Sequence, residues 1–160
     1  MTESLLEILR SNAKESPETM AKLLGVAPEA VEAEIARLER EGVIRGWQAI
    51  VNDDLLPKGH VTAVIEVRVT PEREGGFNRI AEQVSRFEEV NAVYLMSGGY
   101  DLLLFVEGES LLSVARFVSE KLATIHGVLS TATHFKLKTY KQSGVLMATP
   151  GDDGRLAVSP

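Results

Sequence analysis

The chain has 160 residues, of which 44% are hydrophobic and 25% charged, as is typical of a soluble globular protein. It contains no cysteine, which excludes disulfides, thiolate metal sites and cysteine nucleophiles and is compatible with a reducing cytoplasm. Its net charge of −6 gives no general attraction for a DNA duplex, so any basic surface would be local. Neither a membrane-spanning run nor a secretion leader is visible, so we expect a cytoplasmic protein with no membrane partner.

The N-terminal part predicts three short amphipathic helices. The first covers residues 2–13, where leucine and isoleucine side chains recur among polar ones. Ser16 is a favourable N-cap for the second helix, and Gly25 is a favourable stop because glycine accepts a positive φ. The third helix begins at Pro28 and ends at Gly42.

The second and third helices are predicted to form a helix-turn-helix. Ala21 lets the helices approach, Gly25 makes the turn, and the branched Val31 packs beneath the second of them. Residues 43–52 then alternate in polarity and predict a strand or small wing. Residues 1–52 are therefore expected to form a winged helix-turn-helix DNA-binding domain. The alternative is a plain unit of three packed helices.

A domain boundary is predicted at residues 53–60, where proline, glycine and charged residues cluster. Residues 61–143 then follow a β-α-β-β-α-β pattern. This pattern predicts a ferredoxin-like domain, with a four-stranded sheet and two helices on one of its faces, so the fold class is α+β. Residues 144–160 are expected to form a C-terminal tail whose Val145-Leu146-Met147 could add a strand.

Within this domain, apolar residues alternate along the first strand, residues 61–70, and the segment 71–76 ends it. One face of that strand is expected to carry Val61, Ala63, Ile65, Val67 and Val69. Helices are predicted at 77–87 and 111–124, and a last long strand at 128–141. The inward residues of the second helix are predicted to be Leu111, Leu112, Ala115, Val118 and Leu122.

The second face of the sheet is predicted to be apolar as well. Two helices cannot cover all of Val64, Tyr94, Met96 and Leu103 or Phe105. An exposed apolar patch of that extent indicates a partner surface. Because symmetric pairs are the commonest oligomers, a homodimer is expected.

The connection Ser97-Gly98-Gly99-Tyr100-Asp101 lies between two apolar runs and predicts a tight hairpin. Both glycines can take a positive φ and can bring bare backbone close to a neighbour. Asp101 places a carboxylate at the start of a buried strand, where an unpaired charge is costly. The plain alternative is an ordinary hairpin in which Asp101 caps backbone N–H groups.

Three segments in order resemble the Lrp/AsnC (feast/famine) family of transcriptional regulators. Residues 38–46 resemble the family's junction between recognition helix and wing, 97–102 its glycine-aspartate effector turn, and 120–133 its second helix running into the last strand. The resemblance implies an N-terminal DNA-binding domain, a ligand-binding ferredoxin-like (RAM-type) domain, and dimers that often assemble to octamers. It also implies that a small molecule, usually an amino acid, binds between subunits.

The third helix departs from the family pattern. Glu29, Glu32 and Glu34 occupy its first two turns, where base contacts are made. Carboxylates oppose the neutralisation of phosphates, although a glutamate can accept a hydrogen bond from cytosine N4. Alternatively, they stabilise the helix through its dipole. Contacts to the phosphates of double-stranded DNA, expected to be weak, are assigned to Arg37, Arg40 and Arg45.

The predicted effector site combines the hairpin turn with the last strand. Its residues are Gly98, Gly99, Tyr100, Asp101, Thr131 and Thr133. Thr131 and Thr133 are two apart, so their hydroxyls share a face. Glycine N–H groups could hold an amino acid's carboxylate, while Asp101 accepts from its ammonium. Packing between subunits would bring the turn and the strand together.

Two functions remain open. One is an effector-responsive DNA-binding transcriptional regulator that senses an amino acid or a similar small metabolite. The other is a ligand-sensing oligomeric module whose DNA binding is weak or lost. An enzyme, a metal site and a cofactor are not expected, because His60, His126 and His134 have no metal-ligand spacing and no nucleophile-plus-base motif is visible.

Overall fold

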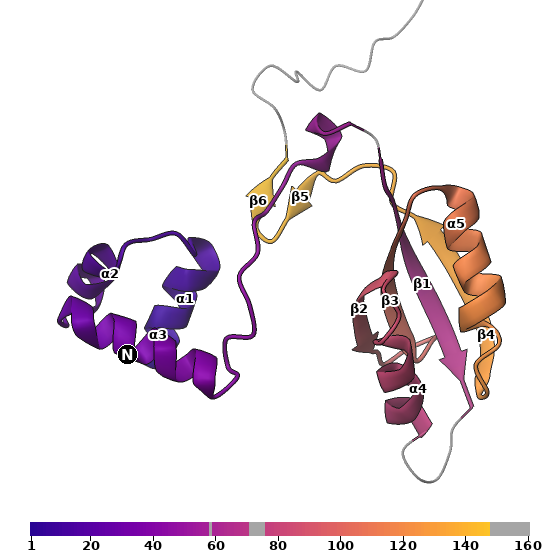
Figure 1. Cartoon of the computed structure of the whole chain (residues 1–160), viewed down its shortest axis with the longest axis horizontal. Helices are drawn as coiled ribbons and strands as arrows, with labels where there is room; N and C mark the ends of the chain where they lie inside the picture. The colour runs from indigo at the N-terminus through magenta and orange to yellow at the C-terminus, as the bar shows by residue number, and fades with distance from the viewer. Residues whose placement is uncertain (58, 71–75, 148–160) are drawn as a thin grey trace, which may run out of the picture. The chain divides into compact units, whose positions relative to one another are not determined.

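The computed structural model describes residues 1–57, 59–70 and 76–147, and the chain divides into two compact units, Met1–Ala49 and Ile50–Pro160. The first unit contains helices α1 (Thr2–Ser11), α2 (Pro17–Leu24) and α3 (Pro28–Arg40) (Figure 1). Their inward faces form one core, which consists of Leu5, Leu9, Met20, Ala21, Val31 and Leu38.

The predicted helix-turn-helix is confirmed. The Oγ atom of Ser16 caps α2 by accepting from the Thr19 N–H at 3.1 Å. Gly25 ends the helix with a φ of +67°, and the next N–H, of Val26, donates to the Ala21 carbonyl at 3.1 Å. This left-handed stop turns the chain directly into α3.

The strand predicted over residues 43–52 does not form. These residues are all described, and none belongs to a sheet. The N–H groups of Val43 and Ile44 instead donate to the Leu38 carbonyl at the end of α3. An alternating sequence makes a strand only when a neighbouring strand accepts its hydrogen bonds, and no strand in the described part of the chain pairs with this segment.

The second unit contains the predicted ferredoxin-like βαββαβ arrangement. Its elements are β1 (Val61–Val69), α4 (Gly76–Val84), β2 (Val90–Leu95), β3 (Leu102–Gly108), α5 (Leu111–Arg116) with the π-helical turn η2 (Phe117–Leu122), and β4 (Val128–Phe135). The strands pair antiparallel in the order β2-β3-β1-β4. A short 3-10 turn, η1 (Asp53–Leu55), precedes the sheet.

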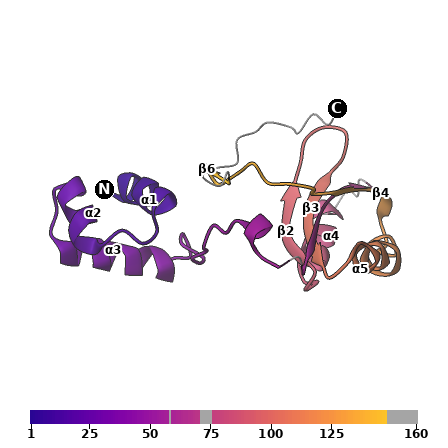
Figure 2. The ribbon, with the colours of Figure 1, turned by 90° about the horizontal axis from the view of Figure 1, so that it is seen from above.

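Helices α4 and α5 cover the same face of this sheet (Figures 1 and 2). The predicted alternation of β1 is confirmed, since Ala63, Ile65, Val67 and Val69 are buried on that face. They pack with side chains from β3 and both helices, which are Leu102, Leu104, Val106, Ile80, Val84, Val114, Phe117, Leu122 and Ile125. The opposite sheet face carries no helix from the described part of the chain.

The predicted inward face of the second helix is partly wrong. Leu111 and Leu112 are 57% and 60% exposed and Ala115 is exposed as well, whereas Val114 and Phe117 are buried. Val114 and Phe117 lie three residues apart, as the ordinary helical period allows, and define the buried side.

A π-helical turn follows, in which the Ala123 N–H donates to the carbonyl five residues earlier. The wider turn places Phe117 and Leu122, which are five residues apart, on the same side of the helix. The ordinary period of about 3.6 residues would not place them there.

The last strand also ends earlier than predicted, at Phe135 rather than residue 141. A short hairpin, β5 (Lys141–Gln142) and β6 (Val145–Leu146), follows it. It is tied to the start of the unit because Asn52 Nδ2 donates to the Met147 carbonyl at 2.8 Å. The break predicted at 71–76 and the rest of the tail lie largely outside the described residues.

None of the described helices is both long enough and apolar enough to span a bilayer.

Candidate nucleic-acid interface and effector site

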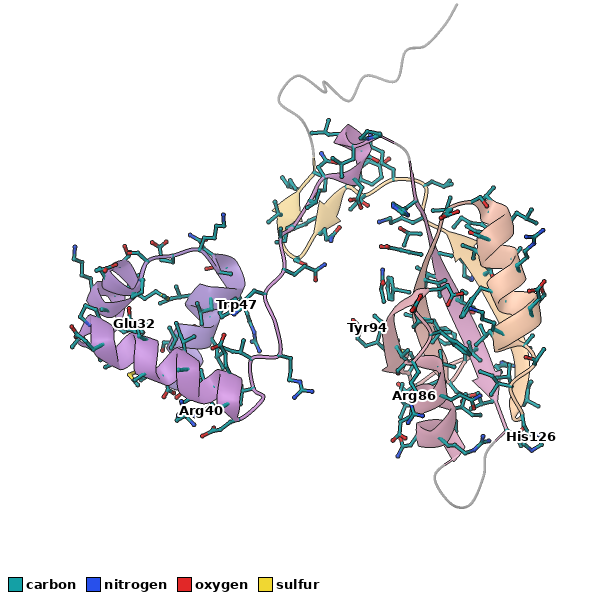
Figure 3. All side chains as sticks on the ribbon, in the orientation of Figure 1. Glu32, Arg40, Trp47, Arg86, Tyr94 and His126 are labelled. Carbon is teal, nitrogen blue, oxygen red and sulfur yellow. The ribbon has the colours of Figure 1, made fainter. Side chains whose placement is uncertain are left out.

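The outward face of α3 is set by what its inward face buries. Val31 and Leu38 lie about two turns apart on the same side and are buried in the core. Glu29, Glu32 and Arg40 consequently project into solvent, as Figure 3 shows for Glu32 and Arg40. Two carboxylates therefore occupy the face that a recognition helix presents to the major groove.

Arg37 is held by two glutamates, Glu34 within α3 and Glu41 directly after its end. Its Nε and Nη2 atoms donate to Glu34 at 2.8 and 2.7 Å, and its Nη1 donates to Glu41 at 2.5 Å. Glu34 is only 8% exposed and also accepts from Thr2 Oγ1 at 2.5 Å. The hydrogen bonds from Arg37 and then Thr2 lower the pKa of Glu34 to about 2. The hydrogen bond from Thr2 to Glu34 thus joins the start of α1 to α3, and Glu34 does not lie on the outward face.

The other two predicted phosphate-binding residues, Arg40 and Arg45, are exposed at and beyond the end of α3. The segment that carries Arg45 is held near the helix by Trp47, whose indole N–H donates to Glu39 Oε1 at 3.0 Å. Of the three predicted arginines, two are therefore available to an anion in solvent, while Arg37 is engaged in an internal network.

The turn between β2 and β3 is open to solvent. The Met96 N–H donates to the Asp101 carbonyl at 2.8 Å, which closes the hairpin. Gly98 has a φ of +139°, in the region that favours glycine, whereas Gly99 does not have a positive φ. A Cβ atom at either glycine would meet no atom within 4 Å. A ligand could therefore approach the bare backbone here.

Three hydrogen bonds fix this turn to β1. The Asp101 N–H donates to the Val67 carbonyl at 3.0 Å, and Asp101 Oδ2 accepts from the Val69 N–H at 2.9 Å. Arg68 Nε donates to the Gly99 carbonyl at 2.7 Å. The capping alternative for Asp101 is thus present, although the capped N–H belongs to a neighbouring strand rather than to the turn.

Thr131 and Thr133 lie apart from the turn within one chain. They pair with Val67 and Ile65 of β1, so they face the side of the sheet that the helices cover. β1 separates them from β3, and two strand spacings amount to roughly 10 Å. The structure therefore confirms that the two threonines share a face but does not bring them to the turn.

Arg68 is the residue of this region that the sequence reasoning missed. The alternation of β1 placed a polar side chain at position 68, on the face opposite Val67. Only the register of β1 with β3 shows that this side chain reaches the turn. No group of three or more acidic or histidine side chains suited to a metal ion occurs within residues 1–57, 59–70 and 76–147.

Comparison with known proteins identifies the second unit. Residues 62–146 match the Lrp/AsnC ligand binding domain. The chain belongs to the Lrp/AsnC family. It is 48% identical over 158 residues to YugG, an uncharacterised HTH-type transcriptional regulator of Bacillus subtilis, with 98% of this chain and 95% of YugG covered.

Two more distant matches are a regulatory protein and a solved structure. The leucine-responsive regulatory protein of Haemophilus influenzae is 26% identical over 143 residues, which cover 89% of this chain and 86% of that protein. A Neisseria meningitidis transcriptional regulator, solved in complex with L-methionine, has the same fold, with a TM-score of 0.68 and 22% identity over 88% of this chain and 90% of that one. The resemblance read from the sequence is thereby confirmed.

Proposed function

We propose that this chain is an effector-responsive, DNA-binding transcriptional regulator of the Lrp/AsnC type, which senses an amino acid or a similar small metabolite in the cytoplasm. The observation that carries the proposal is the joint presence of a helix-turn-helix with an outward α3 and a domain that matches the family's ligand-binding domain. Relatives named as HTH-type regulators support the first half, and the L-methionine complex supports the second.

On DNA, we assign the phosphate contacts to Arg40 and Arg45. Both are exposed, whereas Arg37 would have to leave Glu34 and Glu41 to reach a phosphate. Two such cations facing two exposed glutamates predict weak, salt-dependent affinity, because each neutralised phosphate releases counterions.

In the second unit, we assign the effector to the turn Gly98–Asp101. The backbone there is exposed, and a half-buried carboxylate lies beside it. Tyr100 is half-buried at the same turn. Thr131 and Thr133 would join the site only from another subunit, since β1 separates them from the turn in their own chain.

We further propose that the uncovered sheet face forms a homodimer. Val64, Leu103 and Phe105 are half-buried there, and Tyr94 is 53% exposed on the side away from α5 (Figure 3). The rings of Tyr94 and Phe105 meet edge to face at 6.0 Å. Such an aromatic, apolar centre is typical of a protein interface, and a second copy offers the same self-complementary face. Assembly of dimers to an octamer would then bring further subunits to the turn.

The second candidate function, a ligand-sensing oligomer with little or no DNA binding, is favoured by Glu29 and Glu32 on α3. The two functions are distinguished by fluorescence anisotropy with a labelled DNA fragment from upstream of the gene that encodes this chain. Binding is measured at about 50 mM salt and then at about 200 mM salt. A regulator binds this fragment more tightly than a scrambled duplex and weakens steeply with salt. Absence of binding at low salt, with and without each of the twenty amino acids, would leave the second function.

A further inference from the structure

Arg68 and Asp101 are opposite charges at facing positions that do not pair with each other. The β1–β3 ladder ends at Val67 and Leu102, so the next step places Arg68 opposite Asp101. Facing opposite charges in a sheet usually attract each other directly. Here each side chain bonds instead to backbone, Arg68 to the Gly99 carbonyl and Asp101 to the Val69 N–H.

Each of these side chains keeps most of its bonding capacity. A guanidinium has five N–H donors, and only the Nε–H of Arg68 has a partner within the described residues. Asp101 likewise uses Oδ2, and its Oδ1 accepts no hydrogen bond from that part of the chain. Arg68 is exposed, and the glycines beside it leave open space. A cation and an anion are thus held apart next to an accessible turn.

We propose that Arg68 binds the carboxylate of the effector, while Asp101 binds its ammonium group. The inference rests on the proposed effector function and specifies the ligand as an α-amino acid bound through both charges of its head group. A guanidinium matches a carboxylate through two parallel hydrogen bonds, a geometry that a lysine or a backbone N–H does not provide. The Nε–H bond to Gly99 holds this fork in place before the ligand arrives, which reduces the entropy lost on binding.

The test is calorimetry on the full-length protein with each of the twenty L-amino acids, followed by the amide of the best one, which lacks the carboxylate. The variants are Arg68→Ala and Arg68→Gln, and the control is Arg86→Ala, an exposed arginine in the same unit. Arg68→Gln keeps a donor for the Gly99 carbonyl but has no charge.

We expect both Arg68 variants to bind the amino acid about tenfold or more weakly, because a hydrogen bond to a charged group is lost. Arg86→Ala should bind as the wild type does. The amide should bind the wild type weakly and lose little more in either Arg68 variant, since the partner of Arg68 is already absent.

Three results would overturn the inference, and they differ from one another. Unchanged affinity in both Arg68 variants, with loss in Asp101→Ala, would keep the effector site but remove Arg68 from it. Loss in Arg68→Ala with full affinity in Arg68→Gln would show that Arg68 only positions the turn. Absence of binding by every amino acid to the wild type would refute the amino-acid effector itself.

Discussion

Glu34 illustrates how one residue can be misjudged from sequence. Its spacing from Glu29 and Glu32 suggested a third carboxylate facing DNA, but it is buried and hydrogen-bonded to Arg37 and Thr2. Burying a carboxylate is costly unless such partners compensate. Of these three glutamates, only Glu29 and Glu32 are exposed on α3, and Glu34 serves to hold α3 against α1.

The pKa of Glu34 gives a pH dependence with a definite sign. The pKa is about 2 in the folded chain and 4.5 for an unperturbed glutamate. A lowered folded pKa stabilises the fold above pH 4.5, and this contribution is lost as the pH falls through about 2. Glu34→Gln should lower the melting temperature at pH 7 and make it less dependent on pH between about 5 and 2, measured by circular dichroism.

Glu32→Gln is the matched control, because Glu32 is exposed on the same helix. Its melting temperature should stay close to that of the wild type at pH 7 and between about pH 5 and pH 2. If Glu34→Gln and Glu32→Gln behave alike, the contacts of Glu34 contribute nothing to stability.

At the scale of elements, α3 combines a structural inward face with an unusually acidic outward face. The double variant Glu29→Gln/Glu32→Gln should bind a non-specific duplex more tightly at about 50 mM salt. The gain should be roughly fivefold for each carboxylate near a phosphate, since two charges about 4 Å apart in water interact by about 1 kcal/mol. Fluorescence anisotropy measures it, and unchanged affinity would mean that this face of α3 does not meet DNA.

Phe117, at the end of α5, is one of the apolar residues that support the sheet. Phe117 is 3% exposed and meets the Phe87 ring edge to face at 5.6 Å. Phe117→Ala should cost about 3–5 kcal/mol of unfolding free energy, as buried aromatic truncations do. Leu112→Ala should stay within about 0.5 kcal/mol, because that side chain is largely exposed.

Denaturant unfolding of both variants measures the two free energies. Equal losses of unfolding free energy for Leu112→Ala and Phe117→Ala would mean that Leu112 faces inward, as the sequence predicted. A loss at position 112 alone would also point to a partner that covers the exposed leucines.

At the scale of the whole molecule, the uncovered sheet face is where a second copy is expected. Tyr94→Glu places a charge at its aromatic centre, where an unpaired charge costs at least about 2 kcal/mol, or about thirtyfold in dissociation constant. Sedimentation velocity at micromolar concentration should show a dimer or larger assembly for the wild type and a shift toward monomer for Tyr94→Glu.

Leu111→Glu is the control, since Leu111 is equally exposed but lies on the helical layer. It should leave the assembly intact. A monomeric wild type would contradict the proposed dimer. If Leu111→Glu dissociates the assembly and Tyr94→Glu does not, the subunits meet through the helices instead.

The sequence by itself determined the features that depend on neighbours along the chain. Caps at Ser16 and Gly25 fixed the ends of α2, and the period of two along β1 fixed its buried face, because local backbone geometry dictates both. The ordered segments that resemble the Lrp/AsnC family indicated the rest of the architecture.

Only the tertiary structure decided the features that depend on which strands and helices meet. Residues 43–52 have a strand's alternation, but no strand of the described residues pairs with them. Leu122 shares the buried side of Phe117 through a change of helical period. Glu34 accepts a hydrogen bond from Thr2, which is distant in sequence. Arg68 reaches the turn because the register of β1 with β3 puts it opposite Asp101. Strand register and side-chain partners are set by packing between distant segments, and one sequence read alone does not contain that information.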